Sequence, residues 1–279
     1  MLLNQLIQQH LGQQIKSSDP ISTGIFNAYQ VTLANGKMVF IKYQNNSNDL
    51  LIKEARELTL LSQFIKTPAV LISTQYCLIL EWIESSYNPH TQSQLGEQLA
   101  NLHQQKSTYF GFEFDNKIGD TFQPNAADKK ITNWAEFYWQ YRLLFQIDLA
   151  NKNNHLNSAD YRLLRSLETK LPDLLDFKIT PSLLHGDLWS GNYISNQHDT
   201  YFIDTACYYG HREIDFALSF MFGGFSAEFY SSYQAHYPLD SGFEQRKPLY
   251  MLYHYLNHLN IFGSGYHTNT MHCAKQLLD

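Results

Sequence analysis

The sequence has few cysteines, no long apolar run and no apparent export signal, and each shortage excludes a class of protein. Three cysteines occur among 279 residues (Cys77, Cys207 and Cys273), and no two of them form a Cys-x-x-Cys pair. This argues against a disulfide framework and against a zinc site. No stretch approaches the roughly 18 consecutive apolar residues of a membrane span, and the first residues lack the regions of a signal peptide. We therefore expect a protein of the reducing cytoplasm.

Basic residues are also scarce. The chain has 20 Lys and Arg against 26 Asp and Glu, which gives a net charge of -6, and its pI is near 6.0. Because no block of Lys and Arg creates a basic field, we expect neither nucleic acid nor a membrane surface as a partner. With 44% hydrophobic residues the chain should fold, as one large domain or as two lobes. The oligomeric state stays open.

The first third of the chain has the pattern of a small β-rich lobe, which we place at residues 1–83. Asn35-Gly36 separates two apolar stretches and is typical of a tight hairpin turn. A helical stripe of Leu51, Ala55 and Leu58 follows. Strands are expected at 31–33, 38–43, 70–72 and 76–82, and a helix at 50–65.

The remainder, residues 84–279, has the pattern of a larger and mainly α-helical lobe. Pro172 should end one of its helices, and Pro248 suits the first turn of another, which Gly263 should cap. Helices are expected at 93–105, 134–150, 158–171 and 248–262, with a short strand-rich insert at 182–203. The fold class predicted by this order is α+β with two lobes.

The sharpest pattern is Leu183-Leu-His-Gly-Asp-Leu-Trp-Ser-Gly-Asn192, followed by the short strand Tyr201-Phe-Ile-Asp204. Phosphoryl transfer needs a carboxylate that takes the proton of the attacking hydroxyl, and hard oxygen ligands for Mg²⁺. The Asp-x4-Asn spacing matches the kinase catalytic loop. It predicts Asp187 as the base, with Asn192 and Asp204 as magnesium ligands.

The competing interpretation is that Asp187 and Asn192 merely cap a turn, which is the commoner origin of an isolated Asp-x4-Asn. Three features favour the kinase interpretation. The pair His185-Gly186 precedes the aspartate, the loop lies between strands, and Asp204 ends the next strand.

Lys42 adds a separate indication, because Val39-Phe-Ile-Lys42 is a strand pattern like the kinase Val-Ala-Ile-Lys. A lysine there reaches the phosphates of ATP, while a glutamate on the next helix holds it as an ion pair. Glu54 and Glu57 compete for this role, and we prefer Glu54. Alone, Lys42 would more often be a solvated strand lysine.

The segment expected to cover the nucleotide has few glycines. Neither Gly-x-Gly-x-x-Gly nor Gly-x4-Gly-Lys-Ser/Thr occurs, and the candidate segment Ile21–Asn27 has one glycine, Gly24. Gly24 allows close approach of a phosphate, or is an ordinary turn glycine. Glu81 and Ile83, at the end of a strand, are placed as a hinge whose backbone meets adenine.

These residues resemble the fructosamine kinases, the ketosamine-kinase family related to aminoglycoside phosphotransferases and, more distantly, to protein kinases. The resemblance rests first on His185-Gly-Asp-Leu-Trp-Ser-Gly-Asn192 and runs over nearly the whole chain. Further similar segments are Phe110-Gly-Phe112, Asp115-Asn-Lys-Ile-Gly119, Gln123-Pro-Asn125, Tyr208–Ala217, Phe222-Gly-Gly224 and Leu256–Gly263.

The resemblance implies a bilobal protein-kinase-like fold, ATP and Mg²⁺ as cofactors, and the 3-hydroxyl of a free or protein-bound glycated amine as acceptor, with deglycation repair as the role. It also implies an acceptor surface at Trp189 and, more weakly, at His258. Core packing is an equal alternative for Trp189 and the better one for His258. Asp215 is expected to brace the catalytic loop, and His211-Arg-Glu213 to brace it or to contact substrate.

Two positions depart from the family's pattern. The usual Gly-Gly of the nucleotide loop is Thr23-Gly24, and Ile25 stands where some relatives carry a redox-active cysteine, so no redox switch is expected there. The usual Asp-Pro-Ala is Asp204-Thr-Ala206, which keeps the metal ligand. Two other functions stay open, namely a phosphotransferase of the same fold acting on an aminoglycoside or choline-like alcohol, and a nucleotide-binding pseudokinase.

Overall fold

The computed structural model of the chain describes residues 3–23, 26–45 and 47–278. They form two compact units, the first comprising Met1–Gln94 and Asn192–Thr205 and the second Leu95–Gly191 and Ala206–Asp279. The lobe boundary expected near residue 83 lies inside the first unit, and it stays a prediction. The chain thus returns to the first unit for the fourteen residues that begin at Asn192 and end at Thr205.

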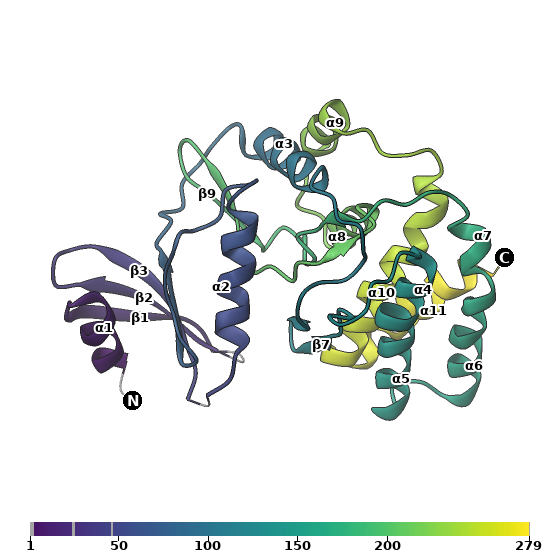
Figure 1. Ribbon diagram of the computed structural model, residues 1–279, viewed down its shortest axis with the longest axis horizontal. Coiled ribbons are helices and arrows are strands. Elements are labelled where there is room, and N and C mark those ends of the chain that lie inside the picture. Colours follow the sequence, from purple (N-terminus) through teal and green to yellow (C-terminus); the bar gives the residue numbers. More distant parts are fainter. Residues whose placement is uncertain (1–2, 24–25, 46, 279) are drawn as a thin grey trace. The chain divides into compact units, whose positions relative to one another are not determined.

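The first unit is built on an antiparallel sheet of five strands in the order β1-β2-β3-β5-β4 (Figure 1). The expected hairpin is confirmed, because Gly36 has φ 84 and donates its N–H to Leu33 O at 2.9 Å. β1 was not predicted, since its sequence IKSSDPIST has no apolar alternation. The strands are β1 (Ile15–Thr23), β2 (Asn27–Leu33), β3 (Met38–Tyr43), β4 (Val70–Ser73) and β5 (Cys77–Glu81).

Alternation along these strands buries both faces of the sheet, each under one helix (Figure 1). Leu6 and Ile7 of α1 (Leu3–Leu11) pack on the face that carries Ile41. Leu58 of α2 (Leu50–Leu61) packs on the opposite face with Leu80. Because Lys42 follows Ile41 on β3, its side chain lies on the α2 face.

A two-stranded hairpin completes the first unit, formed by β9 (Tyr193–Ser195) and β10 (Thr200–Phe202). Phe202 donates its N–H to Lys66 O at 2.9 Å, just beyond the end of α2. This bond anchors the strand that leads directly into Asp204.

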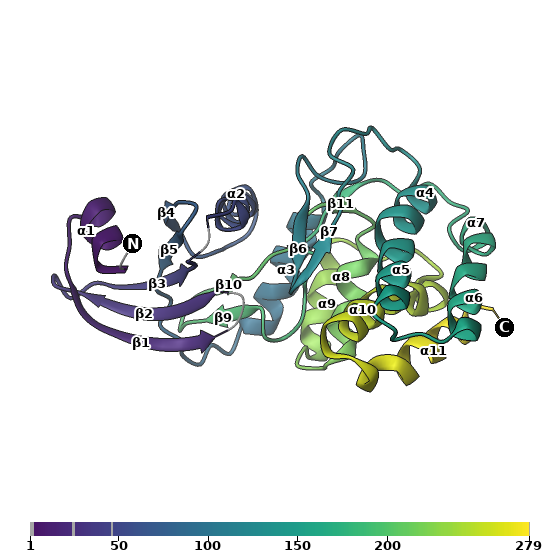
Figure 2. The same ribbon diagram turned by 90° about the horizontal axis from the view of Figure 1, so that it is seen from below.

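The second unit is mainly helical, and α10 is its central helix (Figure 2). α10 contacts α5, α8 and α11, and its buried aromatic and aliphatic side chains form the main core with theirs. The elements of this unit are α3 (Thr91–His103), β6 (Asn116–Ile118), β7 (Thr121–Gln123), α4 (Trp134–Tyr138), a π-helix (Trp139–Leu143), α5 (Leu144–Lys152), α6 (Ser158–Ser166), α7 (Leu171–Leu174), β8 (Ser182–Leu183), β11 (Tyr209–Gly210), α8 (Glu213–Met221), α9 (Ala227–His236), α10 (Phe243–Phe262) and α11 (His267–Gln276).

Both prolines expected to mark helix ends were misassigned. α6 stops at Ser166, and Pro172 lies in the first turn of α7, where its missing N–H needs no partner. α10 begins at Phe243, so Pro248 lies inside it and not in its first turn. The expected cap is confirmed, since Gly263 ends α10 with φ 81.

One buried histidine of α10 makes stability depend on pH. His254 is fully buried, and neither of its ring nitrogens has a hydrogen-bond partner among the described residues. Burial disfavours the imidazolium and lowers the pKa of His254 to about 3. Below the ordinary histidine pKa of about 6.5 the unfolded chain binds a proton at this position that the folded chain does not bind. Acidification from about pH 6.5 towards 3 therefore opposes folding.

We predict that His254→Leu makes unfolding less sensitive to acid. Below pH 6.5, the free energy of unfolding of the variant should exceed that of the wild type, and the difference should grow by up to about 1.4 kcal/mol for each pH unit. Urea titrations between pH 5 and 7.5 measure the two slopes. The exposed His272 supplies the control, since His272→Leu should leave the slope unchanged. Equal slopes for wild type and His254→Leu would contradict the assignment.

Candidate active site

In the first unit, Lys42 of β3 is held between two carboxylates. Its Nζ lies 2.6 Å from Glu54 Oε1 on α2 and 2.5 Å from Asp204 Oδ1, and its side chain is 14% exposed. Of the two glutamates considered for this pairing, the structure uses Glu54. The two ion pairs bring together β3, α2 and the residue that follows the β9–β10 hairpin.

The charge of Lys42 is secured by these partners. Burial by itself would lower its pKa, but the carboxylates of Glu54 and Asp204 raise the pKa of Lys42 above its ordinary value. The ammonium is therefore fully protonated near neutral pH. A fixed cation of this kind suits an anionic ligand such as a phosphate.

Asp204 adopts an unusual backbone conformation beside Asn192. Its φ is 53, in the left-handed region that residues with a Cβ rarely occupy. Asn192 donates from Nδ2 to Asp204 O at 3.3 Å and accepts the N–H of Ile203 at its own carbonyl, at 3.0 Å. The two expected metal ligands are thus neighbours, and they offer an amide and a carboxylate oxygen, which are hard donors that suit Mg²⁺.

An apolar cavity of about 280 Å³ opens next to Lys42 within the first unit. Its volume is near the lower end of the roughly 300–1,000 Å³ of ordinary ligand pockets. Lys42, Glu54 and Asp204 form its charged part, and the end of β5 supplies another wall. The remaining lining residues are Ile21, Ala28, Phe40, Leu58, Pro68, Leu80, Glu81, Trp82, Ile83, Ile194 and Ile203.

The hinge residues expected at this cavity both line it. Ile83 is 7% exposed, and Glu81 accepts the N–H of Ala69, the residue before β4, at Oε2 at 3.3 Å. Gly24, the expected phosphate-loop glycine, lies outside the described residues. The cavity can accept a flat apolar ring at its uncharged walls and an anion near Lys42.

In the second unit, the loop that is expected to be catalytic is held by Asp215 of α8. Asp215 is fully buried, and its two oxygens accept the N–H of His185 at 2.8 Å and of Gly186 at 2.9 Å. The residue expected to brace the loop therefore does so. Asp187 follows directly, donates its N–H to His185 Nδ1 at 3.3 Å, and is partly exposed between buried neighbours.

A chain of polar side chains supports Asp215 from behind. His103 Nε2 lies 3.0 Å from Asp215 Oδ2, and His103 Nδ1 lies 2.9 Å from the hydroxyl of Tyr233, which also receives a hydrogen bond from Arg212 at 3.2 Å. Burial raises the pKa of Asp215, but hydrogen bonds from His103 and from the loop outweigh it and leave that pKa below its ordinary value. Burial lowers the pKa of His103.

Sequence reasoning missed His103 and Tyr233. Both lie on helices at positions where a buried aromatic residue is unremarkable, so no local pattern marked them. The available signal was His103 itself, a titratable residue at the end of an apolar helical stripe.

Gly186 is required by the shape of the loop. Its φ is 87, and a Cβ at this position would lie 2.0 Å from the carbonyl oxygen of Ala206. The Ala206 N–H donates to His185 O at 3.0 Å. The loop before Asp187 and the segment after Thr205 are thus pressed together, with space for glycine alone.

Three aromatic rings lie next to one another, and the first of them belongs to the loop that carries Asp187. Trp189 is 38% exposed and meets Phe222 edge-on at 6.1 Å between centroids, and Phe222 lies 5.1 Å from His258. A Cβ on Gly191 would lie 2.1 Å from the Trp189 ring, so only glycine leaves room for the indole in this position. Trp189 is therefore not a core residue, whereas His258 is partly buried and donates from Nδ1 to His254 O at 2.8 Å.

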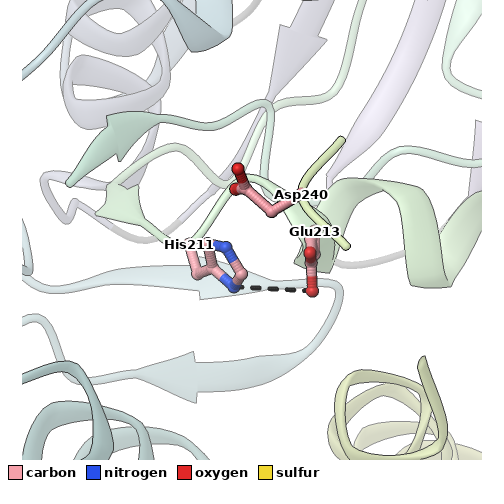
Figure 3. A group of neighbouring side chains, drawn as sticks. All are labelled: His211, Glu213 and Asp240. Atoms are coloured by element: carbon pink, nitrogen blue, oxygen red, sulfur yellow. Dashed lines mark ion pairs between the residues drawn. The ribbon is translucent and has the colours of Figure 1, made fainter. Parts of the chain in front are cut away.

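A second cluster of side chains that could bind a metal has its carboxylates paired with arginines. His211, Glu213 and Asp240 bring their ligand atoms within 4.8 Å of one another, and His211 Nδ1 lies 3.7 Å from Glu213 (Figure 3). Arg246 binds both oxygens of Glu213, at 2.8 and 2.5 Å, and Arg212 lies 3.2 Å from Asp240. Two guanidinium groups occupy the carboxylates, so this cluster serves as a structural brace.

Comparison with known proteins identifies the family. A sequence profile described as fructosamine kinase matches residues 1–279. The chain belongs to the fructosamine kinase family. A probable ketoamine kinase of Enterococcus faecium is 38% identical over 254 residues, which covers 88% of this chain and 90% of that one. Ketosamine-3-kinase of Mus musculus is 32% identical over 309 residues, 98% of each chain.

Solved structures confirm the fold class predicted for a fructosamine kinase. A proposed fructosamine-3-kinase of Thermobifida fusca has a TM-score of 0.90 at 28% identity and covers 99% of this chain and 98% of its own. An ADP-bound aminoglycoside phosphotransferase shares the fold alone, with a TM-score of 0.63 at 18% identity over 98% of this chain and 95% of that one. The α+β, protein-kinase-like architecture is thus established. Among the described residues, no helix is long and apolar enough to cross a membrane.

We predict that Asp215→Asn destabilises the protein by about 2–3 kcal/mol, because the amide keeps one acceptor oxygen and turns donors towards buried N–H groups. Chemical denaturation measures this loss. The matched control is Asp148→Asn, since Asp148 is 51% exposed, and it should change stability by less than about 0.5 kcal/mol. Equal stabilities of the two variants would show that Asp215 does not hold the loop.

Proposed function

We propose that this fructosamine kinase family member transfers the γ-phosphoryl group of ATP to the 3-hydroxyl of a ketosamine, the adduct formed when a sugar such as glucose or ribose glycates an amine. The observation that carries the proposal is the Lys42–Glu54–Asp204 arrangement at an apolar cavity, in a chain 32% identical to a protein named ketosamine-3-kinase.

The nucleotide is proposed to bind in the first unit. The apolar walls of the cavity suit adenine, with the backbone at Glu81 and Ile83 offering hydrogen bonds to its edge. Lys42 then meets the phosphates as a fixed positive charge, and Glu54 keeps it oriented. Gly24 is proposed to approach the phosphates from the covering loop.

Asn192 and Asp204 are proposed to hold magnesium. Their amide and carboxylate oxygens are the donor types that this ion prefers, and the two residues are neighbours in the first unit. Magnesium bound there would neutralise charge that develops on the transferring phosphoryl group. The role of the protein is to supply the two oxygens at fixed positions.

Asp187 of the second unit is proposed as the base. Its carboxylate accepts a hydrogen bond from the 3-hydroxyl of the acceptor and orients that oxygen towards the γ-phosphorus. It takes the proton as the new P–O bond forms and the bond from the γ-phosphorus to the β–γ bridging oxygen breaks, with ADP as the leaving group. The brace of Asp215 on His185 and Gly186 fixes the backbone from which Asp187 projects. Phosphoryl transfer requires this carboxylate together with the groups of the first unit.

Trp189 and His258 are proposed to receive the acceptor. The exposed indole offers a face to the C–H edges of a sugar and to a nearby cationic amine. Phe222 lies between Trp189 and His258 and so extends the same aromatic surface. Phosphorylation at O3 destabilises the ketosamine linkage, which makes deglycation repair the proposed biological role, on free or protein-bound amines.

An aminoglycoside or choline-like acceptor is the second candidate, and a pseudokinase the third. Likeness to the aminoglycoside enzymes is at the level of fold alone. One assay panel separates the three, by measuring Mg²⁺-dependent ATP turnover with ribuloselysine, fructoselysine, an aminoglycoside and choline. We expect turnover with the first two, and ATP binding without any transfer would indicate the pseudokinase.

Loss of the proposed base should reduce the chemical step. We predict that Asp187→Asn lowers kcat by about 10²–10⁴-fold, the usual contribution of a positioned general base, while Kd for ATP changes little. Single-turnover phosphorylation of fructoselysine and calorimetric ATP binding measure the two effects. An Asp187→Asn variant that keeps full kcat would remove Asp187 from the mechanism.

The acceptor surface gives a different kinetic signature. We predict that Trp189→Ala raises KM for fructoselysine about 3–30-fold through the loss of stacking and cation–π contacts, that Trp189→Phe recovers part of it, and that KM for ATP is unchanged. Tyr87→Ala removes an aromatic side chain that is 85% exposed, and it is the control expected to change neither constant. An unchanged KM in Trp189→Ala would place the acceptor elsewhere.

A further inference from the structure

Helix α2 carries a second buried carboxylate that the proposed reaction does not use. Glu57 lies three residues after Glu54 and is 2% exposed. Its Oε2 accepts a hydrogen bond from Thr205 Oγ1 at 3.0 Å. Burying an ionised carboxylate is unfavourable unless its partners compensate, so the position of Glu57 needs an explanation beyond packing.

The partner of Glu57 directly follows the proposed metal ligand. Thr205 is the neighbour of Asp204, whose φ of 53 is a left-handed conformation. For a residue with a Cβ this conformation costs roughly 1–3 kcal/mol and persists only where surrounding contacts enforce it. A side-chain hydrogen bond on the next residue is such a contact.

Helix α2 therefore reaches Asp204 by two routes. Through Glu54 it holds Lys42, which binds the Asp204 carboxylate at 2.5 Å. Through Glu57 it holds Thr205, and with it the backbone that aims this carboxylate. The first route fixes the carboxylate of Asp204, and the second fixes the backbone of Asp204.

We propose that Glu57 and Thr205 are positioning residues of the nucleotide site, whose hydrogen bond holds the Asp204 backbone so that the carboxylate faces the divalent cation of the bound nucleotide. The inference rests on the proposed kinase function. Neither residue touches the reacting atoms. Without their bond, Asp204 loses a contact that helps to keep the left-handed conformation, and its carboxylate samples orientations that bind the cation poorly.

The test removes the hydroxyl while keeping the branched shape. Thr205→Val should raise Kd for Mg²⁺ together with a non-hydrolysable ATP analogue about tenfold, a factor in keeping with loss of a hydrogen bond to a charged group. Thr205→Ser, which keeps the hydroxyl, should bind like the wild type. Isothermal calorimetry gives these constants without any acceptor, so a wrong acceptor assignment would leave this result intact.

The partner side is tested with Glu57→Met. It should weaken binding of the magnesium–nucleotide complex to a similar degree, and the double variant Thr205→Val/Glu57→Met should be no weaker than either single one, because all three lack the same bond. The apparent Mg²⁺ requirement of ATP turnover should rise in parallel, with a smaller change in kcat at saturating Mg²⁺.

The matched control is Thr59→Val, the same chemical change on an exposed residue of α2 whose hydroxyl bonds Ala55 O within the helix. It should leave the binding constant unchanged. If Thr205→Val does not fold, Thr205→Ala replaces it. Binding of wild-type strength in a folded variant without the hydroxyl, or strictly additive effects in the double variant, would overturn the proposal.

Discussion

The ammonium of Lys42 is the group on which the first unit depends. A buried cation is tolerated only with compensating charge nearby, and here the compensation comes from two carboxylates on separate segments, Glu54 of α2 and Asp204 after β10. The need to pair one lysine twice brings three distant parts of the sequence to one point. The charged end of the cavity is a consequence of that pairing, and so is its suitability for phosphates.

In the second unit the buried charge is negative, and it is compensated in the same way. Asp215 is a buried anion, and its compensation comes from the backbone N–H groups of His185 and Gly186 and from His103. A buried charge with several directed partners fixes geometry more closely than apolar packing, because each hydrogen bond has a preferred direction. Lys42 thus holds the carboxylate of Asp204 in the first unit, and Asp215 holds the backbone that precedes Asp187 in the second.

Sequence reasoning was most successful where one local pattern determines one position. The strand pattern Val39-Phe-Ile-Lys42 placed Lys42 on β3, and the spacing from Asp187 to Asn192 marked the loop. It failed where tertiary contacts decide. The brace through His103 joins residues more than one hundred positions apart, and Pro248 lies inside α10 because packing of the helix outweighs one missing hydrogen bond.

The choice between Glu54 and Glu57 shows why such limits arise. Residues three apart on a helix share one face, so both carboxylates point inward and no periodicity separates them. The structure gives each a different partner, Lys42 for Glu54 and Thr205 for Glu57. The ambiguity in the sequence therefore had a physical source. Glu54 and Glu57 lie on one helical stripe and both contact the segment around Asp204, Glu54 through the ammonium of Lys42 and Glu57 through the hydroxyl of Thr205. A sequence pattern that assigns one ion pair therefore describes half of this contact.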